Sequence, residues 1–272
     1  MRRSLLFLAT FPAVLCAQSA SAPAARGNNG FSTERLRRAD AYLQQQVDSN
    51  RIAGAVGLVL RDGKVVYERA VGWADKESGR RMATDAMFRI ASQTKALTSI
   101  AIMILLEEGK VALNNPVGRF IPAYARTTVL MDGQVVPARR PITIRDLLTH
   151  TAGISYGTDS ALASLYRDKG LGPAAGWGWY TADKDEPVCT TMERLATLPF
   201  SRQPGEAFVY GYNTDILGCV VEKASGVSLE EFITTRITGP LRMVDPQSVD
   251  NCSLGHDSPK RSAVRALFRS RR

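Results

Sequence analysis

Ser92-Gln93-Thr94-Lys95 is the only S-x-x-K sequence in this chain of 272 residues. At helical spacing it puts a hydroxyl and an amine on one face, one turn apart. The run that follows, 96–106, is almost entirely apolar, which predicts a helix buried on all sides that ends near Gly109. Ser92 is then expected at the helix N-terminus, where the dipole favours negative charge. An acyl-transfer nucleophile needs such a hydroxyl, a nearby neutral amine and a positive field.

Other roles for Ser92, and other catalytic groups, are less consistent with the sequence. A serine at a helix start is by itself more often only an N-cap. A Ser-His-Asp triad needs a histidine, and the chain has only His150 and His256, too few also for a zinc site. His256 lies in a tail without globular pattern, and His150 is expected to cap the C-terminus of a helix over 142–150. Ser155 stands in a G-x-S-x-G sequence, but the segment before it is helix-like where a nucleophile elbow needs a buried strand, so Ser155 is rejected as nucleophile.

Three segments together resemble the serine β-lactamase superfamily, most closely the branch of class C β-lactamases, D-Ala-D-Ala peptidases and family VIII carboxylesterases. They are 88–117 around the S-x-x-K sequence, the stretch Ile142-Thr143-Ile144-Arg145-Asp146-Leu147-Leu148-Thr149-His150-Thr151-Ala152-Gly153, and the stretch from Pro204-Gly205-Glu206 through Tyr210 to Leu217-Gly218. They occur in the family's order and cover roughly residues 30 to 245. Three such segments in order are far more specific than the tetrapeptide alone.

The resemblance implies roles for particular residues. Ser92 would be the acylated nucleophile, with its backbone N–H as one oxyanion donor, and Lys95 would be the base or its partner. Tyr210 would relay the proton to the leaving group. The family's Y-x-N is displaced here to Tyr210-Gly211-Tyr212-Asn213, which leaves Asn213 as a weak candidate for substrate contact. Tyr210 is preferred over Tyr212 because its spacing to Leu217-Gly218 resembles that of the esterase-like members.

The resemblance also implies the fold class: α/β of the α+β type, with a mixed, mostly antiparallel sheet flanked by helices and a helical lobe at about 113–200. The hydrolase domain is expected over 28–245, after a signal peptide at 1–22. The family's third motif, of the K-T-G or W/H-G-G type, is missing, and 246–272 form an atypical basic tail. With the C-terminal sheet strands missing, the chain is expected to fold poorly or to turn over weakly, because losing one oxyanion donor costs about a hundred- to a thousandfold in rate.

The distribution of charge along the chain limits which classes of partner are expected. Three arginines and no acid lie in 1–27, and six basic residues against one acid lie in 251–272, so little of the net +9 remains for the body. A nucleic-acid partner is therefore not indicated. Residues 1–22 pair an Arg-Arg start with a short apolar core and small residues, with candidate cleavage sites at Ala17 or at 20–22, which predicts export to the periplasm or the medium. The apolar run is too short for a stable membrane span.

Local patterns predict the remaining elements. A helix is expected over 32–50, and β-hairpins over 53–71 and 129–136, each around an Asp-Gly turn. Short helices are expected over 191–198 and 229–237, and a segment broken by prolines over 113–124. The Gly- and aromatic-rich stretch 154–190 either walls an acyl pocket or is a surface excursion. A bond between Cys189 and Cys219 is left open by the sequence.

The sequence thus predicts an exported serine hydrolase, esterase-like, that acts through an acyl-enzyme on small-molecule ester, amide or β-lactam substrates without a metal or cofactor. Two alternatives remain: a catalytically impaired, truncated homologue, and a non-catalytic binding protein.

Overall fold

The computed structural model describes residues 30–88, 90–172, 186–243 and 264–265. Residues 264 and 265 are described in backbone only. The predicted signal peptide, the aromatic residues at 177–180 and most of the basic tail lie outside these ranges. The chain divides into two compact units, residues 1–84 and 85–272.

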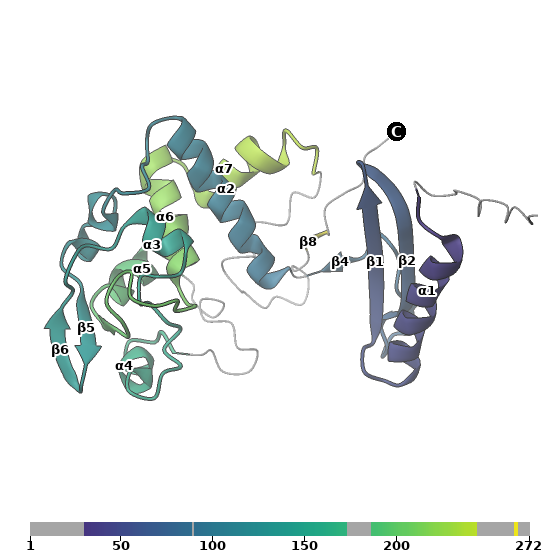
Figure 1. Ribbon diagram of the computed structural model, residues 1–272, viewed down its shortest axis with the longest axis horizontal. Coiled ribbons are helices and arrows are strands. Elements are labelled where there is room, and N and C mark those ends of the chain that lie inside the picture. The colour runs from purple at the N-terminus through teal and green to yellow at the C-terminus, as the bar shows by residue number, and fades with distance from the viewer. Residues whose placement is uncertain (1–29, 89, 173–185, 244–263, 266–272) are drawn as a thin grey trace, which may run out of the picture. The chain divides into compact units, whose positions relative to one another are not determined.

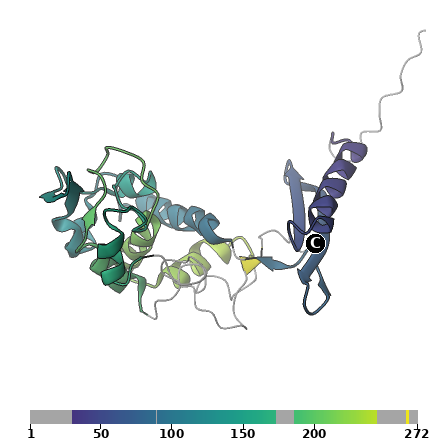
Figure 2. The ribbon, with the colours of Figure 1, turned by 90° about the horizontal axis from the view of Figure 1, so that it is seen from below.

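The first unit is a helix packed on a hairpin. Helix α1 (Thr33–Asp48) begins where Ser32 caps it through a hydrogen bond from the Arg35 N–H. Strands β1 (Gly54–Arg61) and β2 (Lys64–Asp75) pair antiparallel, and β3 (Arg80–Arg81) extends the sheet. Figures 1 and 2 both show α1 lying along the hairpin. The expected helix over 32–50 and the first hairpin are confirmed.

The turn of this hairpin follows directly from its sequence. Asp62 and Gly63 have φ values of 50° and 71°, the left-handed pair that a two-residue turn of type I′ requires. Across the sheet, the Tyr67 hydroxyl donates to the Asp40 carboxylate of α1 at 2.9 Å. A side chain at Gly57 would collide with the Tyr67 ring, 2.8 Å from the Cβ position, so glycine lets the tyrosine lie flat between strand and helix.

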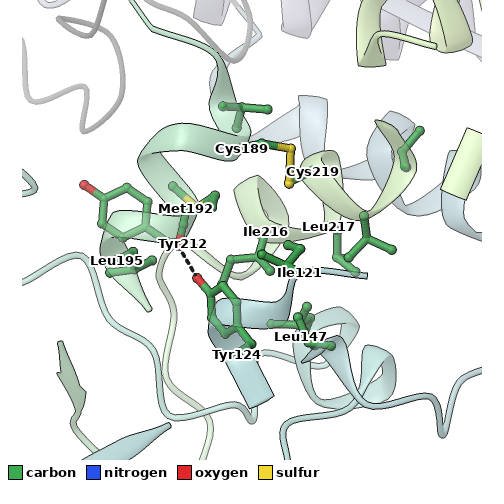
Figure 3. Close-up of a cluster of buried hydrophobic side chains, with 14 of the residues drawn as sticks. Ile121, Tyr124, Leu147, Cys189, Met192, Leu195, Tyr212, Ile216, Leu217 and Cys219 are labelled. Carbon is green, nitrogen blue, oxygen red and sulfur yellow. Dashed lines mark hydrogen bonds between the residues drawn. A yellow bond between two sulfur atoms is a disulfide. The ribbon is translucent and has the colours of Figure 1, made fainter. Parts of the chain in front are cut away.

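The second unit is mainly helical around one apolar core. Its helices are α2 (Thr94–Glu107), α3 (Ile144–Leu148), α4 (Ala163–Asp168), α5 (Val188–Leu195), α6 (Asn213–Ser225) and α7 (Leu229–Ile233). Figure 3 shows where α3, α5 and α6 meet the segment around Tyr124. The fully buried Tyr124 hydroxyl donates to the Met192 carbonyl at 2.9 Å, which satisfies its polar end.

Short turns and strands complete this unit. The proline-broken stretch forms 3₁₀ turns at Val117–Arg119 and Pro122–Ala125. Strands β5 (Thr128–Met131) and β6 (Gln134–Pro137) form the second expected hairpin, and β5 pairs parallel with β7 (Pro199–Phe200). The backbone of β8 (Val264–Arg265) pairs with β4 (Met87–Phe88). The predicted helix over 229–237 is divided, since α7 passes into a π-helical turn at Thr234–Thr238.

Helix α2 departs from the sequence expectation on one side. Ala101, Ile102 and Leu105 are fully buried, but Ile100 and Met103 are 45% and 38% exposed. Among the described residues of this unit, α2 packs against α6 and α7 (Figure 1). The composition predicted burial all round, but burial needs a neighbouring element on each side, and composition alone does not supply one.

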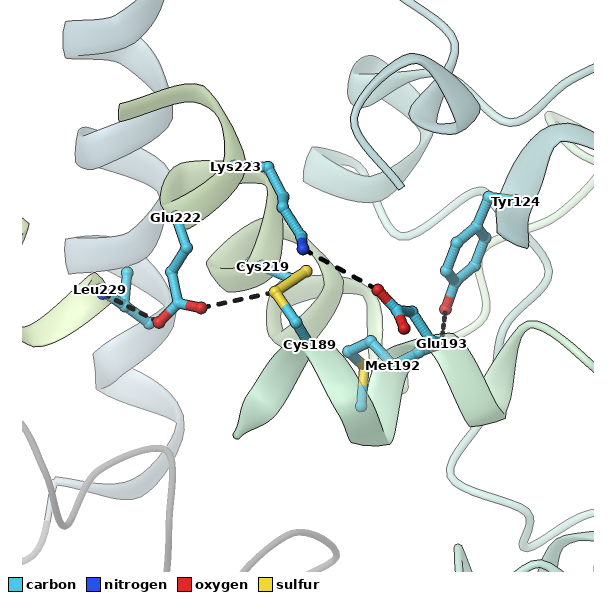
Figure 4. Close-up of a disulfide and its surroundings, with 8 residues drawn as sticks. All are labelled: Tyr124, Cys189, Met192, Glu193, Cys219, Glu222, Lys223 and Leu229. Carbon is cyan, nitrogen blue, oxygen red and sulfur yellow. Dashed lines mark hydrogen bonds and ion pairs between the residues drawn. A yellow bond between two sulfur atoms is a disulfide. The ribbon is translucent and has the colours of Figure 1, made fainter. Parts of the chain in front are cut away.

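A disulfide joins two helices of this core. Cys189 lies in the first turn of α5 and Cys219 in the middle of α6, and their sulfurs are bonded (Figure 4). Figure 4 also shows Lys223 reaching toward Glu193 across the same two helices. The pairing that the sequence left open is therefore present, and it fixes α5 to the helix that begins just after Tyr210.

Candidate active site

Ser92 stands in a tight turn that leads into α2. The turn is a 3₁₀ helix, Ala91–Gln93, and α2 begins at Thr94. Ala91 has a φ of 45°, a left-handed conformation that costs an L-residue free energy. Ser92 is exposed, and Lys95 is half-buried in the first turn of α2. Ser92, the candidate nucleophile, thus lies two residues before the start of α2, and the Lys95 amine lies in the first turn of that helix.

The structure brings Ser92, Lys95 and Tyr210 together, although 118 residues separate the serine from the tyrosine. The Tyr210 hydroxyl lies 2.7 Å from the Ser92 Oγ, and the Lys95 Nζ lies 3.4 Å from the same oxygen. The Lys95 Nζ is also 4.9 Å from the centre of the Tyr210 ring. A hydroxyl, an amine and a phenol therefore share one small volume, which is the constellation needed for proton transfer from a nucleophile.

Tyr210 differs from the neighbouring Tyr212 in where its hydroxyl points. Tyr210 is 43% exposed and faces Ser92, whereas Tyr212 is fully buried and donates to the Leu171 carbonyl at 2.7 Å. Gly211 separates them, and a Cβ there would lie 2.3 Å from the Ile154 carbonyl oxygen. The close backbone approach at Gly211 therefore directs one tyrosine into the site and the other into the core.

The environment of Tyr210 lowers the pKa of its phenol relative to that of a free tyrosine. Burial alone would raise the pKa of this phenol, but hydrogen bonds with Ser92 and Lys95 and the lysine charge act the other way, and together they lower it below its ordinary value. A phenol with a lowered pKa, next to a serine hydroxyl, is a better proton acceptor than an isolated tyrosine is at neutral pH.

Tyr156 is a site residue that sequence reasoning did not single out. Its hydroxyl lies 3.2 Å from the Lys95 Nζ, and its ring meets the Tyr210 ring edge to face at 5.7 Å. It belongs to the G-x-S-x-G segment, in which Ser155 is 4% exposed and accepts the Gly157 N–H at 3.1 Å. The Ser155 hydroxyl thus stabilises a local turn. The residue of this segment that contacts the site is the adjacent Tyr156.

His150 and Asn213 form a second layer behind Tyr210. The His150 ring stacks on the Tyr210 ring at 4.8 Å, and its Nδ1 lies 3.0 Å from the Asn213 Nδ2. His150 follows the C-terminus of α3 as expected, with a φ of 55° and its N–H bonded to the Leu147 carbonyl, but its ring turns toward the site and not toward the helix carbonyls. Asn213 is fully buried, so it offers a substrate no accessible atom, and the expectation of a substrate contact finds no support in this placement.

No group of three or more His, Cys, Asp or Glu side chains in the described ranges is arranged to hold a metal ion. None of the helices within those ranges combines the length and the apolar character required to cross a bilayer.

A serine in contact with a lysine and a tyrosine, at the start of a helix in a mixed α and β fold, is an arrangement suited to activating the serine as a nucleophile. Residues 39–252 match the family model described as Beta-lactamase. The chain belongs to this family, whose members similar to it include esterases and peptidases.

Individual relatives support the same assignment. The chain is 37% identical over 227 residues to the esterase EstB of Burkholderia gladioli, covering 84% of this chain and 53% of the relative. It is 32% identical to the lovastatin esterase of Penicillium rubens, covering 76% and 52%. The solved structure of EstCE1, a hydrolase with promiscuous acyltransferase activity, is 30% identical with a TM-score of 0.66, covering 77% and 52%. These likenesses confirm the β-lactamase-like fold class, and the chain spans about half the length of these relatives.

Proposed function

We propose that this protein is an esterase-like serine hydrolase that acts through an acyl-enzyme on Ser92. The observation that carries the proposal is the 2.7 Å contact between the Tyr210 hydroxyl and the Ser92 Oγ, with the Lys95 Nζ 3.4 Å from that oxygen. The esterase names of two relatives at 37% and 32% identity favour esters over other acyl substrates.

The distances favour Tyr210 as the group that exchanges the proton. Tyr210 is the closer of the two neighbours of the Ser92 oxygen, and the lowering of its pKa makes its phenolate less costly to form than that of a free tyrosine. Lys95 then acts mainly through its charge, which stabilises that phenolate. The Ser92 proton passes to the Tyr210 oxygen while the Oγ forms a bond to the substrate carbonyl carbon.

The second half of the acylation uses the same proton. As the bond between the carbonyl carbon and the leaving oxygen breaks, Tyr210 gives the proton to that oxygen and the alcohol departs. A water molecule then repeats the sequence on the acyl-Ser92 ester and releases the acid. The backbone N–H of Ser92 is expected to donate to the oxyanion in both steps.

We also propose that the protein is exported. Two features support this: the signal-like pattern of residues 1–22, and the bond between Cys189 and Cys219, because disulfides persist in oxidising compartments. Expression of the full sequence in a bacterial host, followed by N-terminal sequencing of periplasmic protein, should show a mature chain starting after Ala17 or Ala22. A cytoplasmic chain that keeps its first residues would contradict export.

The catalytic proposal is tested with a fluorophosphonate probe, which reacts covalently with activated serines. The unmodified protein should be labelled, Ser92→Ala should abolish labelling, and Ser155→Ala should leave it intact as the matched control. Labelled penicillin, applied in parallel, reports whether β-lactams acylate the same residue. Labelling that survives in Ser92→Ala, or that is lost only in Ser155→Ala, would overturn the assignment. Hydrolysis of p-nitrophenyl butyrate then measures turnover.

A further inference from the structure

His150 holds the Tyr210 segment through its main chain and its ring together. Its carbonyl accepts the Val209 N–H at 2.7 Å, and its φ of 55° turns the chain sharply after α3. The same turn sends the ring back over the Tyr210 ring, with centres 4.8 Å apart and planes inclined by 29°. Stacking in this range contributes to fixing a side chain beyond simple burial. The phenol that touches Ser92 is therefore supported on its far side by an imidazole.

The buried Asn213 amide determines where the imidazole carries its proton. The Asn213 Nδ2 lies 3.3 Å from the Ile154 carbonyl oxygen and 3.2 Å from the Val209 carbonyl oxygen, which can only accept. Turning the amide over would bring its oxygen against both. The Nδ2 therefore also faces the His150 Nδ1, at 3.0 Å, as a donor. The Nδ1 must accept, which leaves the single ring proton on Nε2.

The same arrangement opposes a positive charge on the ring. An imidazolium would point an N–H at the Asn213 N–H₂, and two donors would face each other. Around the ring, Lys95 on α2 is the charged neighbour that acts on it, Tyr210 is the phenol that it touches, and Asn213 on α6 is neutral. Burial of the ring, followed by the charge of Lys95, lowers the pKa of His150 below its ordinary value.

We propose that His150 is a positioning residue: its uncharged ring, oriented by Asn213, holds the Tyr210 phenol against the Ser92 hydroxyl. The inference rests on the proposed hydrolase function and extends it to two residues that contact neither Ser92 nor its oxygen in the hydrogen bonds of the described structure. It also accounts for the buried Asn213 Oδ1, which has no hydrogen-bond partner in the described structure: the two amide N–H groups are oriented toward two carbonyl oxygens and the His150 Nδ1, and this orientation fixes the position of the oxygen. Loss of the ring would let the phenol move, and a displacement of about 1 Å can cost about a hundredfold in rate.

The first test measures how fast the fluorophosphonate labels Ser92 at several probe concentrations. His150→Phe keeps a ring on Tyr210 and should label within about threefold of the unmodified protein, whereas His150→Ala should be slower by about tenfold or more in maximal rate, with little change in half-saturating concentration. Phe208→Ala is the control. The Phe208 ring lies beside the same imidazole, with ring centres 5.7 Å apart, but it is 68% exposed, so its loss should leave the Tyr210 ring in place. A phenylalanine variant as slow as the alanine variant, or an alanine variant as fast as the unmodified protein, overturns the proposal.

The second test does not need activity. The sequence has two histidines, so His256→Gln leaves His150 as the only imidazole for ¹⁵N nuclear magnetic resonance. The spectrum at pH 7 should show the Nε2–H tautomer with a titration midpoint below 6.5, and Asn213→Ala should raise the midpoint. An Nδ1–H tautomer, or a midpoint at or above 6.5, overturns the proposal. If the unmodified protein takes no label but the spectrum is as expected, the hydrolase function fails while the arrangement of the ring stands.

Discussion

Removing the bond between Cys189 and Cys219 should lower stability much more than it changes the site. The bond closes a chain separation of 30 residues and ties α5 to α6 (Figure 4). The perturbation is Cys189→Ala combined with Cys219→Ala, which removes both sulfurs and leaves no unpaired thiol at either position. The bond closes the segment 189–219, which includes Tyr210 and Asn213, but the site contacts of these two residues involve neither sulfur, so labelling of Ser92 should change less than stability does.

The magnitude follows from the length of the closed loop. In the chain-entropy description, closing a loop of this length removes about 12 cal/mol/K of entropy from the unfolded state, or about 3.6 kcal/mol at 25 °C. This is a large part of the roughly 5–15 kcal/mol by which domains are usually stable. Both cysteines are buried, at 8% and 0% exposed, so the two missing sulfurs add a packing loss of about 1 kcal/mol.

Urea unfolding of the non-reduced protein, followed by circular dichroism, measures the difference. The double variant should unfold at a lower urea concentration, by a free energy of about 3–5 kcal/mol. Cys252→Ser is the matched control and should unfold like the unmodified protein. An unfolded, non-reduced mature chain should react with a thiol reagent at Cys252 alone. Reaction at three thiols, or equal unfolding of both variants, would refute the reasoning.

Three further substitutions test the support of the site. Asp146→Asn breaks the paired hydrogen bonds with Arg140 and should lower the free energy of unfolding by about 2 kcal/mol at pH 7. Burial raises the pKa of the Asp146 carboxyl, but its hydrogen bonds lower that pKa on balance. The difference in unfolding free energy between variant and unmodified protein, measured by urea titration, should therefore shrink as the pH falls below about 3.9. Tyr210→Phe keeps the ring but removes the phenol, so fluorophosphonate labelling should slow by about a hundredfold or more, while an unchanged rate would contradict the proton path. Gly211→Ala puts a Cβ 2.3 Å from the Ile154 oxygen and should cost about 1–3 kcal/mol in urea unfolding together with slower labelling; a silent substitution would contradict the close approach.

Features encoded by neighbouring residues were predictable from the sequence. Both Asp-Gly turns form where expected, because Asp62, Gly63, Asp132 and Gly133 all adopt positive φ values that these residue types tolerate. Ser32 begins α1 for the same kind of local reason, through its own hydrogen bond to the helix. Such elements depend on interactions over two to four residues, which a single sequence displays directly.

Features that depend on distant segments were predictable only through resemblance, or not at all. Ser92 and Tyr210 were paired because the family places such segments in this order, not because any periodicity joins residues 118 apart. The site roles of Tyr156 and His150 were not predicted. Tyr156 contacts a lysine 61 residues away, and no local sequence pattern distinguishes such a tyrosine from one on a surface loop. The exposed side of α2 was missed for the converse reason, because composition reports apolarity but not which neighbours are present.

The displaced Y-x-N sequence shows how the site and the core depend on each other. Tyr210, Gly211, Tyr212 and Asn213 are consecutive, yet they serve four different neighbours: Ser92, the Ile154 backbone, the Leu171 carbonyl and the His150 ring. Because two of these side chains are fully buried, the segment is held by the core and only the phenol of Tyr210 is free to face the nucleophile. The asparagine of this segment therefore has its amide in the layer behind the tyrosine. There it can act on the reaction only by fixing the charge and tautomer of the imidazole on which that tyrosine rests.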